Sequence, residues 1–213
     1  MTSPSARPEP WAWHLLGLLT PLLVLSGNLA GGWWVLTGFV FVEVVGPILD
    51  VSLGREEPAR PPPPSGRPFE ALLYVHAALH FAVLAALLYR ASLDGAAWTT
   101  LGAAVSTGLS SGVSGIIVAH EFGHRRPRSL PWWIGQANLL SVLYLHFTTE
   151  HNHTHHRLVA TSEDPATARR GESLWAFVVR TVPSQLRDAI DVHASKGKSG
   201  SSNPVVRGLL LQA

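Results

Sequence analysis

Four long apolar stretches dominate the first 119 residues of the 213-residue chain. Each is long enough to cross the roughly 30 Å hydrocarbon core of a bilayer, which takes about 20 helical residues. Between residues 11 and 49 the only charged side chain is Glu43. The pattern therefore predicts four membrane-spanning helices, which cover residues 11–29, 32–49, 70–89 and 97–119.

The segments between these spans are short or rich in proline. Residues 1–10 are expected to form a disordered lead-in, and turns at 30–31 and 90–96 join the spans into two hairpins. Residues 50–67 contain four consecutive prolines and three arginines, which indicates an extended linker. Because basic residues favour the cytoplasm, we expect a transmembrane unit over 11–119 whose linker and two ends are cytoplasmic.

The remaining part of the chain, residues 120–213, has a different pattern. From Glu121 to the end there are 18 charged residues, of which 11 are basic. The apolar stretch 130–147 is predicted to be an interfacial, re-entrant or end-packed helix, because a fifth crossing would separate two clusters of histidines. Residues 171–192 repeat apolar side chains at helical spacing, which predicts an amphipathic helix on the membrane surface. The predicted fold class is all-α, a membrane helical bundle with a cytoplasmic, histidine-rich helical cap.

Composition supports a membrane protein. Charged residues make up 14% of the chain, against roughly 25% in a typical soluble domain. The chain has no cysteine, which excludes disulfides, thiolate metal sites and cysteine nucleophiles. The formal net charge is +2 and no segment matches a nucleic-acid-binding module, so no nucleic-acid partner is expected.

Seven of the 11 histidines lie between residues 120 and 156, in two main clusters. In the first, His120 and His124 are four residues apart, so on a helix they share one face and can bind one metal. In the second, His151 and His155 have the same spacing and His156 follows. Five imidazoles exceed the three or four protein ligands of one zinc ion, and with no cysteine they fit two iron ions. The competing interpretation of the second cluster is an exposed histidine tract that binds metal adventitiously.

Histidine ligands generally need a partner that orients the ring. Glu121, Glu150 and Asp164 are the acidic candidates for this role, and His146 is a further one. Glu121 also has an alternative role, because the HExxH pattern is typical of zinc proteases, where the acid is the general base.

Four segments carry a family resemblance: HEFGHRR (120–126), TEHNHTHHRLVAT (149–161), EDPATARRGES (163–173) and PILDVSLG (47–54). They resemble the corresponding segments of bacterial membrane alkane 1-monooxygenases. The resemblance implies a six-span, di-iron enzyme of the bacterial inner membrane that hydroxylates the terminal carbon of n-alkanes or related apolar chains with dioxygen. It also implies a rubredoxin-type electron donor. The iron ligands it implies, without His153, are His120, His124, His151, His155 and His156.

The family pattern also includes two further spans and a third histidine box, so about four ligands are missing from these 213 residues. We therefore expect the sequence to be truncated or partial, and inactive as it stands unless another segment completes the site. Trp33 and Trp34 are candidates for the wall of a substrate channel, and the alternative for both is an interfacial aromatic belt. The competing functions are a fatty-acid desaturase or lipid hydroxylase on the same scaffold, and an intramembrane zinc metalloprotease.

Overall fold

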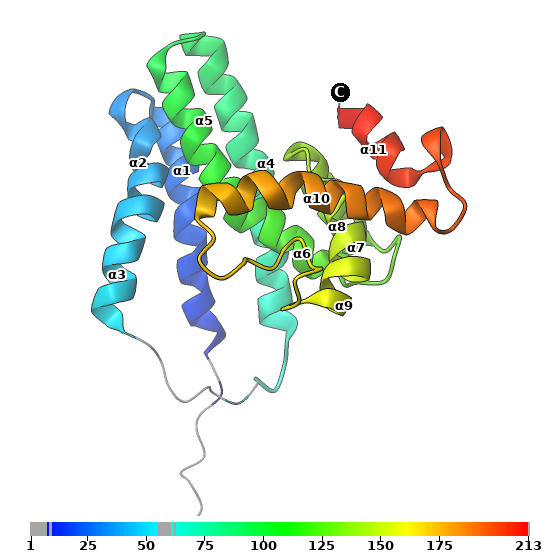
Figure 1. Cartoon of the computed structure of the whole chain (residues 1–213). Coiled ribbons are helices and arrows are strands. Elements are labelled where there is room, and N and C mark those ends of the chain that lie inside the picture. The colour runs from blue at the N-terminus through cyan, green and yellow to red at the C-terminus, as the bar shows by residue number, and fades with distance from the viewer. Residues whose placement is uncertain (1–7, 9, 55–60, 62, 213) are drawn as a thin grey trace, which may run out of the picture. The chain divides into compact units, whose positions relative to one another are not determined.

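The computed structural model of the chain describes residues 8, 10–54, 61 and 63–212 (Figure 1). Within these ranges every regular element is a helix, which confirms the predicted all-α class. The chain divides into two compact units, Met1–Val118 and Ala119–Ala213. The predicted lead-in, apart from Pro8 and Pro10, lies outside the described residues, as do residues 55–60 and 62 of the predicted linker.

Four helices in the described part of the chain are long and apolar enough to cross a membrane, as predicted. Some of them contain 3-10 or π-helical turns, and the second runs to Leu53, four residues beyond its predicted end. The first span consists of η1 (Trp11–Leu18) and α1 (Leu19–Ala30), and the second of η2 (Gly32–Leu36), α2 (Thr37–Val40), η3 (Phe41–Val45) and α3 (Gly46–Leu53). The third span is α4 (Arg67–Asp94), and the fourth consists of α5 (Trp98–Ser110), η4 (Ser111–Ile116) and α6 (Ile117–Gly123).

Small residues and buried hydrogen bonds hold the helices of the first unit together. A Cβ atom on Gly38 would lie 2.2 Å from the Val24 side chain, so only glycine allows this approach of α2 to α1. The Asn28 amide donates to the Thr107 hydroxyl at 3.0 Å, which links α1 to α5. In a bilayer such close packing and interhelical hydrogen bonds replace the hydrophobic drive of a soluble core.

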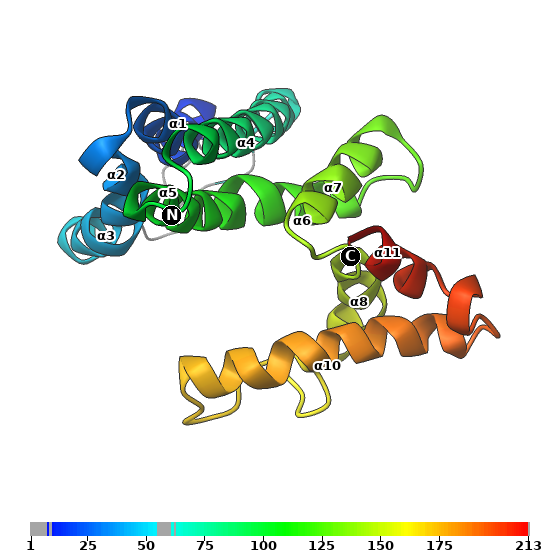
Figure 2. The same cartoon turned by 90° about the horizontal axis from the view of Figure 1, so that it is seen from above.

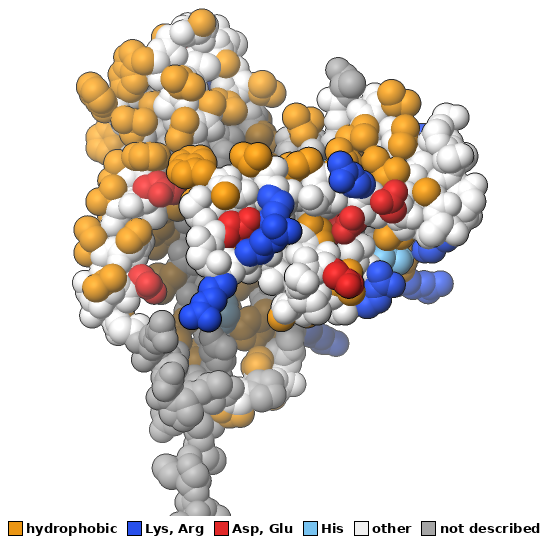
Figure 3. Space-filling model, viewed as in Figure 1, with side chains coloured by type: hydrophobic (Ala, Val, Ile, Leu, Met, Phe, Trp, Pro, Cys, Tyr) orange, Lys and Arg blue, Asp and Glu red, His pale blue; other side chains and the backbone are white. Residues whose placement is uncertain are grey.

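The face of this unit that Figure 3 shows carries many apolar side chains. The large exposed side chains include Leu16, Ile48, Val51, Leu88 and Leu101. A surface of this kind suits contact with lipid chains and is unusual for a protein surrounded by water.

Arg90 of α4 closes the hairpin between the first two spans. Its Nε donates to the Asn28 carbonyl at 2.8 Å and its Nη2 donates to the Leu29 carbonyl at 2.6 Å. These carbonyls belong to the last turn of α1, where a helix leaves acceptors unpaired. The guanidinium passes so close to Gly31 that a Cβ atom there would lie 2.6 Å from it, and Gly31 also has φ of +74°.

We predict that Gly31→Ala destabilises the protein more than Gly32→Ala does. Gly32 also has a positive φ, +55°, but a Cβ atom there meets nothing within 4 Å. The positive φ alone should lower the free energy of unfolding of either alanine variant by on the order of 1–2 kcal/mol. Gly31→Ala adds the overlap with Arg90, so its total loss should be on the order of 3 kcal/mol. Chemical denaturation in detergent micelles, followed by circular dichroism, measures both losses. Equal losses would contradict this account of the hairpin.

The second unit begins within α6 and continues with short helices, a loop and one long helix. Its helices after α6 are α7 (Leu130–Ser141), α8 (Phe147–Glu150), η5 (His151–His155), α9 (His156–Leu158), α10 (Leu174–Ala194), η6 (Gly200–Ser202) and α11 (Pro204–Gln212). Figure 2 shows α8 crossing the middle of α10, against which it packs. Gly135 allows α7 to approach α6, because a Cβ atom there would lie 3.0 Å from Cβ of the fully buried Phe122.

The stretch 130–147 does not form a fifth span. Its main helix, α7, has 12 residues and is therefore about 18 Å long, too short to cross a bilayer. The chain turns after α7 and enters α8, so the two histidine clusters stay in one compact unit.

The predicted amphipathic helix is α10. The Ser173 hydroxyl caps it by accepting from the Ala176 N–H at 3.3 Å. One face buries Thr181, Gln185 and Ala189. The exposed apolar side chains, by contrast, are concentrated in its first half: Leu174, Trp175, Val178, Val179 and Val182. The position of this helix on a membrane surface stays a prediction.

Candidate metal centre

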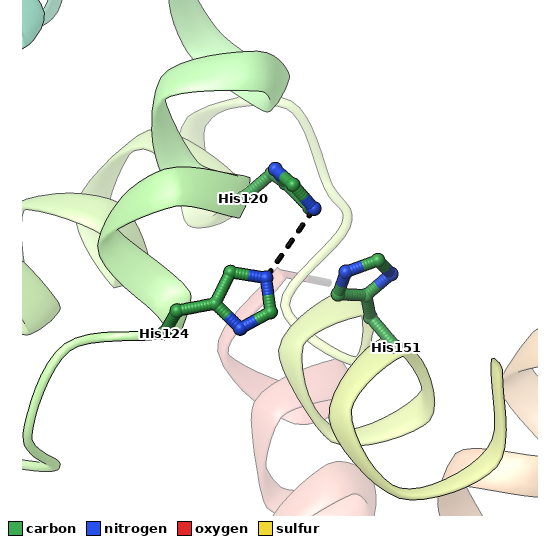
Figure 4. Close-up of side chains that lie close together, drawn as sticks. All are labelled: His120, His124 and His151. Atoms are coloured by element: carbon green, nitrogen blue, oxygen red, sulfur yellow. Dashed lines mark hydrogen bonds between the residues drawn. The ribbon is translucent and has the colours of Figure 1, made fainter. Parts of the chain in front are cut away.

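Three histidines from two helical segments converge on one point (Figure 4). His120 lies on α6, His124 directly follows that helix, and His151 opens η5. Each offers a ring nitrogen, and these three atoms lie within 4.8 Å of one another. The Nε2 atoms of His120 and His124 are 3.4 Å apart.

The other two predicted ligands join the same cluster. The ring centroid of His156 lies 4.5 Å from that of His151 and 5.1 Å from that of His124. The ring of His155 stacks on His151 at 5.2 Å. His153, which the resemblance leaves out, is exposed, and its Nδ1–H donates to the Thr149 carbonyl at 3.0 Å.

A π-helical turn brings the second set of histidines together. In an α-helix each residue turns about 100°, so His156 would lie about 140° round the axis from His151. The turn η5 is instead π-helical, with wider i→i+5 hydrogen bonds and a smaller rotation per residue. As a result His155 and His156 both stay on the side of His151. The sequence argument counted His156 among the five imidazoles, but its α-helical spacing explained only how His151 and His155 share one face.

Contacts outside the imidazoles hold the two clusters against each other. The Asn152 amide donates to the Gly123 carbonyl at 3.1 Å, which ties η5 to the end of α6. The Phe147 ring stacks on His151, with centroids 5.0 Å apart and an interplanar angle of 17°. The sequence analysis singled out neither residue, although Asn152 lies inside the second histidine motif.

Two carboxylates hold imidazoles from the side that faces away from the cluster. The Nδ1–H of His120 donates to Glu121 at 3.0 Å, and the Nδ1–H of His155 donates to Asp164 at 2.9 Å. With the proton fixed on Nδ1, the lone pair of each ring is on Nε2. Burial by itself would raise the pKa of Asp164, but hydrogen bonds from Thr167, the Ala166 N–H and His155 outweigh it and lower the pKa.

The surroundings of two central imidazoles, His151 and His124, favour their neutral form. Burial lowers the pKa of His151 to about 3, and the neighbouring rings, His120 first, act in the same direction. Burial, followed by His120 and His156, also lowers the pKa of His124. The His151 Nε2 atom is buried and has no hydrogen-bond partner among the residues that the structure describes. Neutral imidazoles with such a buried acceptor fit a transition-metal ion, which binds only unprotonated nitrogen.

Comparison with known proteins identifies the family. The fatty acid desaturase family model matches residues 96–195, which include both histidine clusters. Alkane 1-monooxygenase of Ectopseudomonas oleovorans is 32% identical over 81% of this chain and 45% of its own length. Alkane 1-monooxygenase 1 of Alcanivorax borkumensis is 32% identical over 84% of this chain and 46% of its own length.

The chain belongs to the membrane alkane monooxygenase family. A more distant relative is the xylene/toluene monooxygenase hydroxylase component of Pseudomonas putida, which is 29% identical over 84% of this chain and 49% of its own length. The chain thus spans about half the length of the curated relatives it matches.

The other two predicted supporting residues of this alkane monooxygenase family member, Glu150 and His146, are buried, and their roles stay predictions. Glu150 is 1% exposed, and burial, followed by Asp164 and Asp188, raises its pKa to about 7. His146 is 5% exposed and its ring lies 4.5 Å from that of Tyr144. Within the described ranges, neither ring nitrogen of His146 nor Oε1 of Glu150 makes a hydrogen bond.

Trp33 and Trp34 lie in η2, at the hairpin of the first unit. They are 77% and 65% exposed, and the Trp33 ring packs on that of Trp98 at 4.7 Å. Their predicted role in a substrate channel is not tested by this placement and stays a prediction.

The loop after the second histidine cluster is fastened by an ion pair that the sequence analysis did not identify. Arg180 of α10 donates from Nε and Nη2 to the two carboxylate oxygens of Glu172, both at 2.7 Å. These hydrogen bonds, followed by one from the Arg169 N–H, lower the pKa of Glu172 to about 2. The only feature of the sequence that pointed to this ion pair is Arg180 itself, a basic residue in the apolar half of the predicted amphipathic helix.

We predict that Glu172→Gln lowers the melting temperature at neutral pH and that the loss disappears in acid. The folded-state pKa lies below the ordinary value of 4.5, so the ionised pair stabilises the fold fully above pH 4.5. This stabilisation is lost as the pH falls from 4.5 towards 2. Thermal unfolding of both proteins across this range measures the difference.

Glu163→Gln is the matched control, because Glu163 lies on the same loop and is exposed. Its effect should be small at every pH. A Glu172→Gln deficit that persists unchanged at pH 2.5 would show that the ion pair does not cause it.

Proposed function

We propose that this chain provides the metal-binding part of a membrane monooxygenase that inserts one atom of dioxygen into an apolar substrate. The observation that carries the proposal is a cluster of five imidazoles from two segments of one compact unit. Ring nitrogens of His120, His124 and His151 lie within 4.8 Å of one another, and the rings of His155 and His156 contact this group. The names of the relatives supply the type of reaction.

We propose two iron ions as the cofactor. Five imidazoles exceed the four ligands of a single tetrahedral ion, and the chain offers no thiolate that would favour zinc. Iron bound there would supply the activation of dioxygen that amino-acid side chains cannot perform. Glu121 and Asp164 would keep the proton of His120 and His155 on Nδ1, so that Nε2 faces the metal.

The proposed substrate is an n-alkane or a related long apolar chain, hydroxylated at its terminal carbon. Relatives are named as alkane 1-monooxygenases, and the first unit exposes a largely apolar surface through which a lipid-dissolved substrate can approach. A second candidate, desaturation or hydroxylation of a fatty acyl chain, is favoured by the match to the fatty acid desaturase family. A zinc protease accounts for HEFGH but leaves the second histidine cluster without a role.

We propose that electrons come from an external rubredoxin-type protein. The chain has no cysteine and therefore no iron–sulfur relay of its own. Basic residues outnumber acidic ones by 11 to 7 after His120, which favours an acidic partner and a cytoplasmic position for the second unit. The proposed location is the bacterial inner membrane, with the apolar part of α10 lying on the cytoplasmic surface.

The first test is metal binding by the purified membrane protein. We predict that iron binds to the unaltered chain and that His124→Ala lowers the bound iron at least several-fold, because it removes a central ligand. His153→Ala is the matched control, since His153 belongs to the same histidine-rich segment but lies outside the cluster. Metal analysis after gel filtration gives the stoichiometry. Equal losses in the two variants would instead indicate an adventitious histidine tract.

The second test is product analysis with the full-length protein in membranes, supplied with a reduced rubredoxin. We predict a terminal alcohol from n-octane that carries one oxygen atom from ¹⁸O-labelled dioxygen. An acyl thioester converted to an unsaturated product, with octane untouched, would establish the desaturase candidate instead.

A further inference from the structure

Asp164 sits in a loop that is closed by its own hydrogen bonds. Its side chain is fully buried and accepts from the Thr167 hydroxyl at 2.6 Å and from the Ala166 N–H at 2.9 Å. The Thr167 hydroxyl also accepts from the Ala160 N–H at 3.0 Å. The carboxylate oxygen that accepts from Thr167, Oδ2, also accepts from the Nδ1–H of His155 at 2.9 Å. The position of the His155 ring therefore depends on where this loop is held.

Arg180 of α10 donates hydrogen bonds to the same loop. Its Nη1 donates to the Pro165 carbonyl at 3.0 Å and its Nη2 donates to the Thr167 carbonyl at 3.1 Å. These two carbonyls flank Ala166, whose N–H is one of the donors to Asp164. The ion pair with Glu172 fixes the guanidinium on its other edge. The same arginine thus binds both ends of the segment that follows Asp164.

A neighbouring contact fixes the register of α10 on the loop. The buried Thr181 hydroxyl donates to the Pro165 carbonyl at 2.8 Å, and the Gln185 amide donates to the Thr181 hydroxyl at 3.0 Å. Tyr144 in turn donates to the Gln185 side chain. The Pro165 carbonyl therefore accepts two hydrogen bonds from adjacent residues of one helix.

We propose that Arg180 is a positioning residue for the metal centre, which acts through the Pro165–Thr167 segment and Asp164 to orient the His155 imidazole. The inference rests on the proposed metal-binding function of the histidine cluster. The hydrogen bonds of Arg180 within the described residues go to Glu172, Pro165 and Thr167, and none goes to one of the five histidines. Its planar guanidinium makes four hydrogen bonds in one fixed arrangement, a pattern that the single ammonium group of lysine cannot reproduce.

The test measures binding of Co²⁺, which takes imidazole ligands and has visible absorption bands that report its coordination. We expect Arg180→Gln to weaken Co²⁺ binding by about 10-fold, within the range caused by loss of groups that orient metal ligands, and to change the band positions. Arg180→Lys should lie between Arg180→Gln and the unaltered protein. Arg187→Gln, which removes a charge from the same helix without touching the 165–167 segment, should bind Co²⁺ normally. Circular dichroism checks that every variant is folded.

A double-variant cycle separates positioning from general stability. If Arg180 acts through Asp164, then Arg180→Gln should add little to the loss of Co²⁺ affinity already caused by Asp164→Asn. Additive losses, or unchanged affinity and spectrum in folded Arg180→Gln, would overturn the positioning role while the metal centre stands. Absence of Co²⁺ binding by the unaltered protein would overturn the metal centre as well.

Discussion

The histidine cluster depends on hydrogen bonds between carboxylates and the far sides of its imidazoles. Rings that present their nitrogens to a common point attract one another only weakly, and nitrogens 3.4 Å apart share at most one hydrogen bond. Their arrangement must therefore be enforced from outside. Glu121 does so for His120 at an exposed position, whereas Asp164 does so for His155 from a fully buried one. The buried carboxylate in turn requires the loop, and the loop requires α10.

The carboxylates orient the rings, and burial of the rings favours their neutral form. An imidazole that loses contact with water and lies among other imidazoles becomes difficult to protonate, and His151 is the extreme case. Burial also raises the pKa of Glu150 to about 7, so this carboxyl, which precedes His151 in the chain, is only partly ionised near neutral pH. The surroundings thus favour a site whose positive charge is brought by a metal and not by the histidines.

The two units solve the problem of buried polar groups in different ways. In the first unit one arginine, Arg90, satisfies the Asn28 and Leu29 carbonyls at the end of α1, which the helix itself leaves without a partner. In the second unit Arg180 donates hydrogen bonds both to carbonyls of a loop and to the Glu172 carboxylate.

The amino-acid sequence by itself determined the four spans, the helical class and the two histidine motifs, because hydropathy and i, i+4 spacing are local properties of a chain. It also predicted that Glu121 and Asp164 are candidates to support the rings. Only the tertiary structure decided that His156 joins His151 through a π-turn, that Glu150 and His146 are buried, and that Arg180 fastens the loop of Asp164. These features depend on contacts between segments that are distant in sequence, and on the backbone geometry that those contacts impose. Hydrophobic periodicity and short motifs describe only neighbouring residues, so they cannot predict such features.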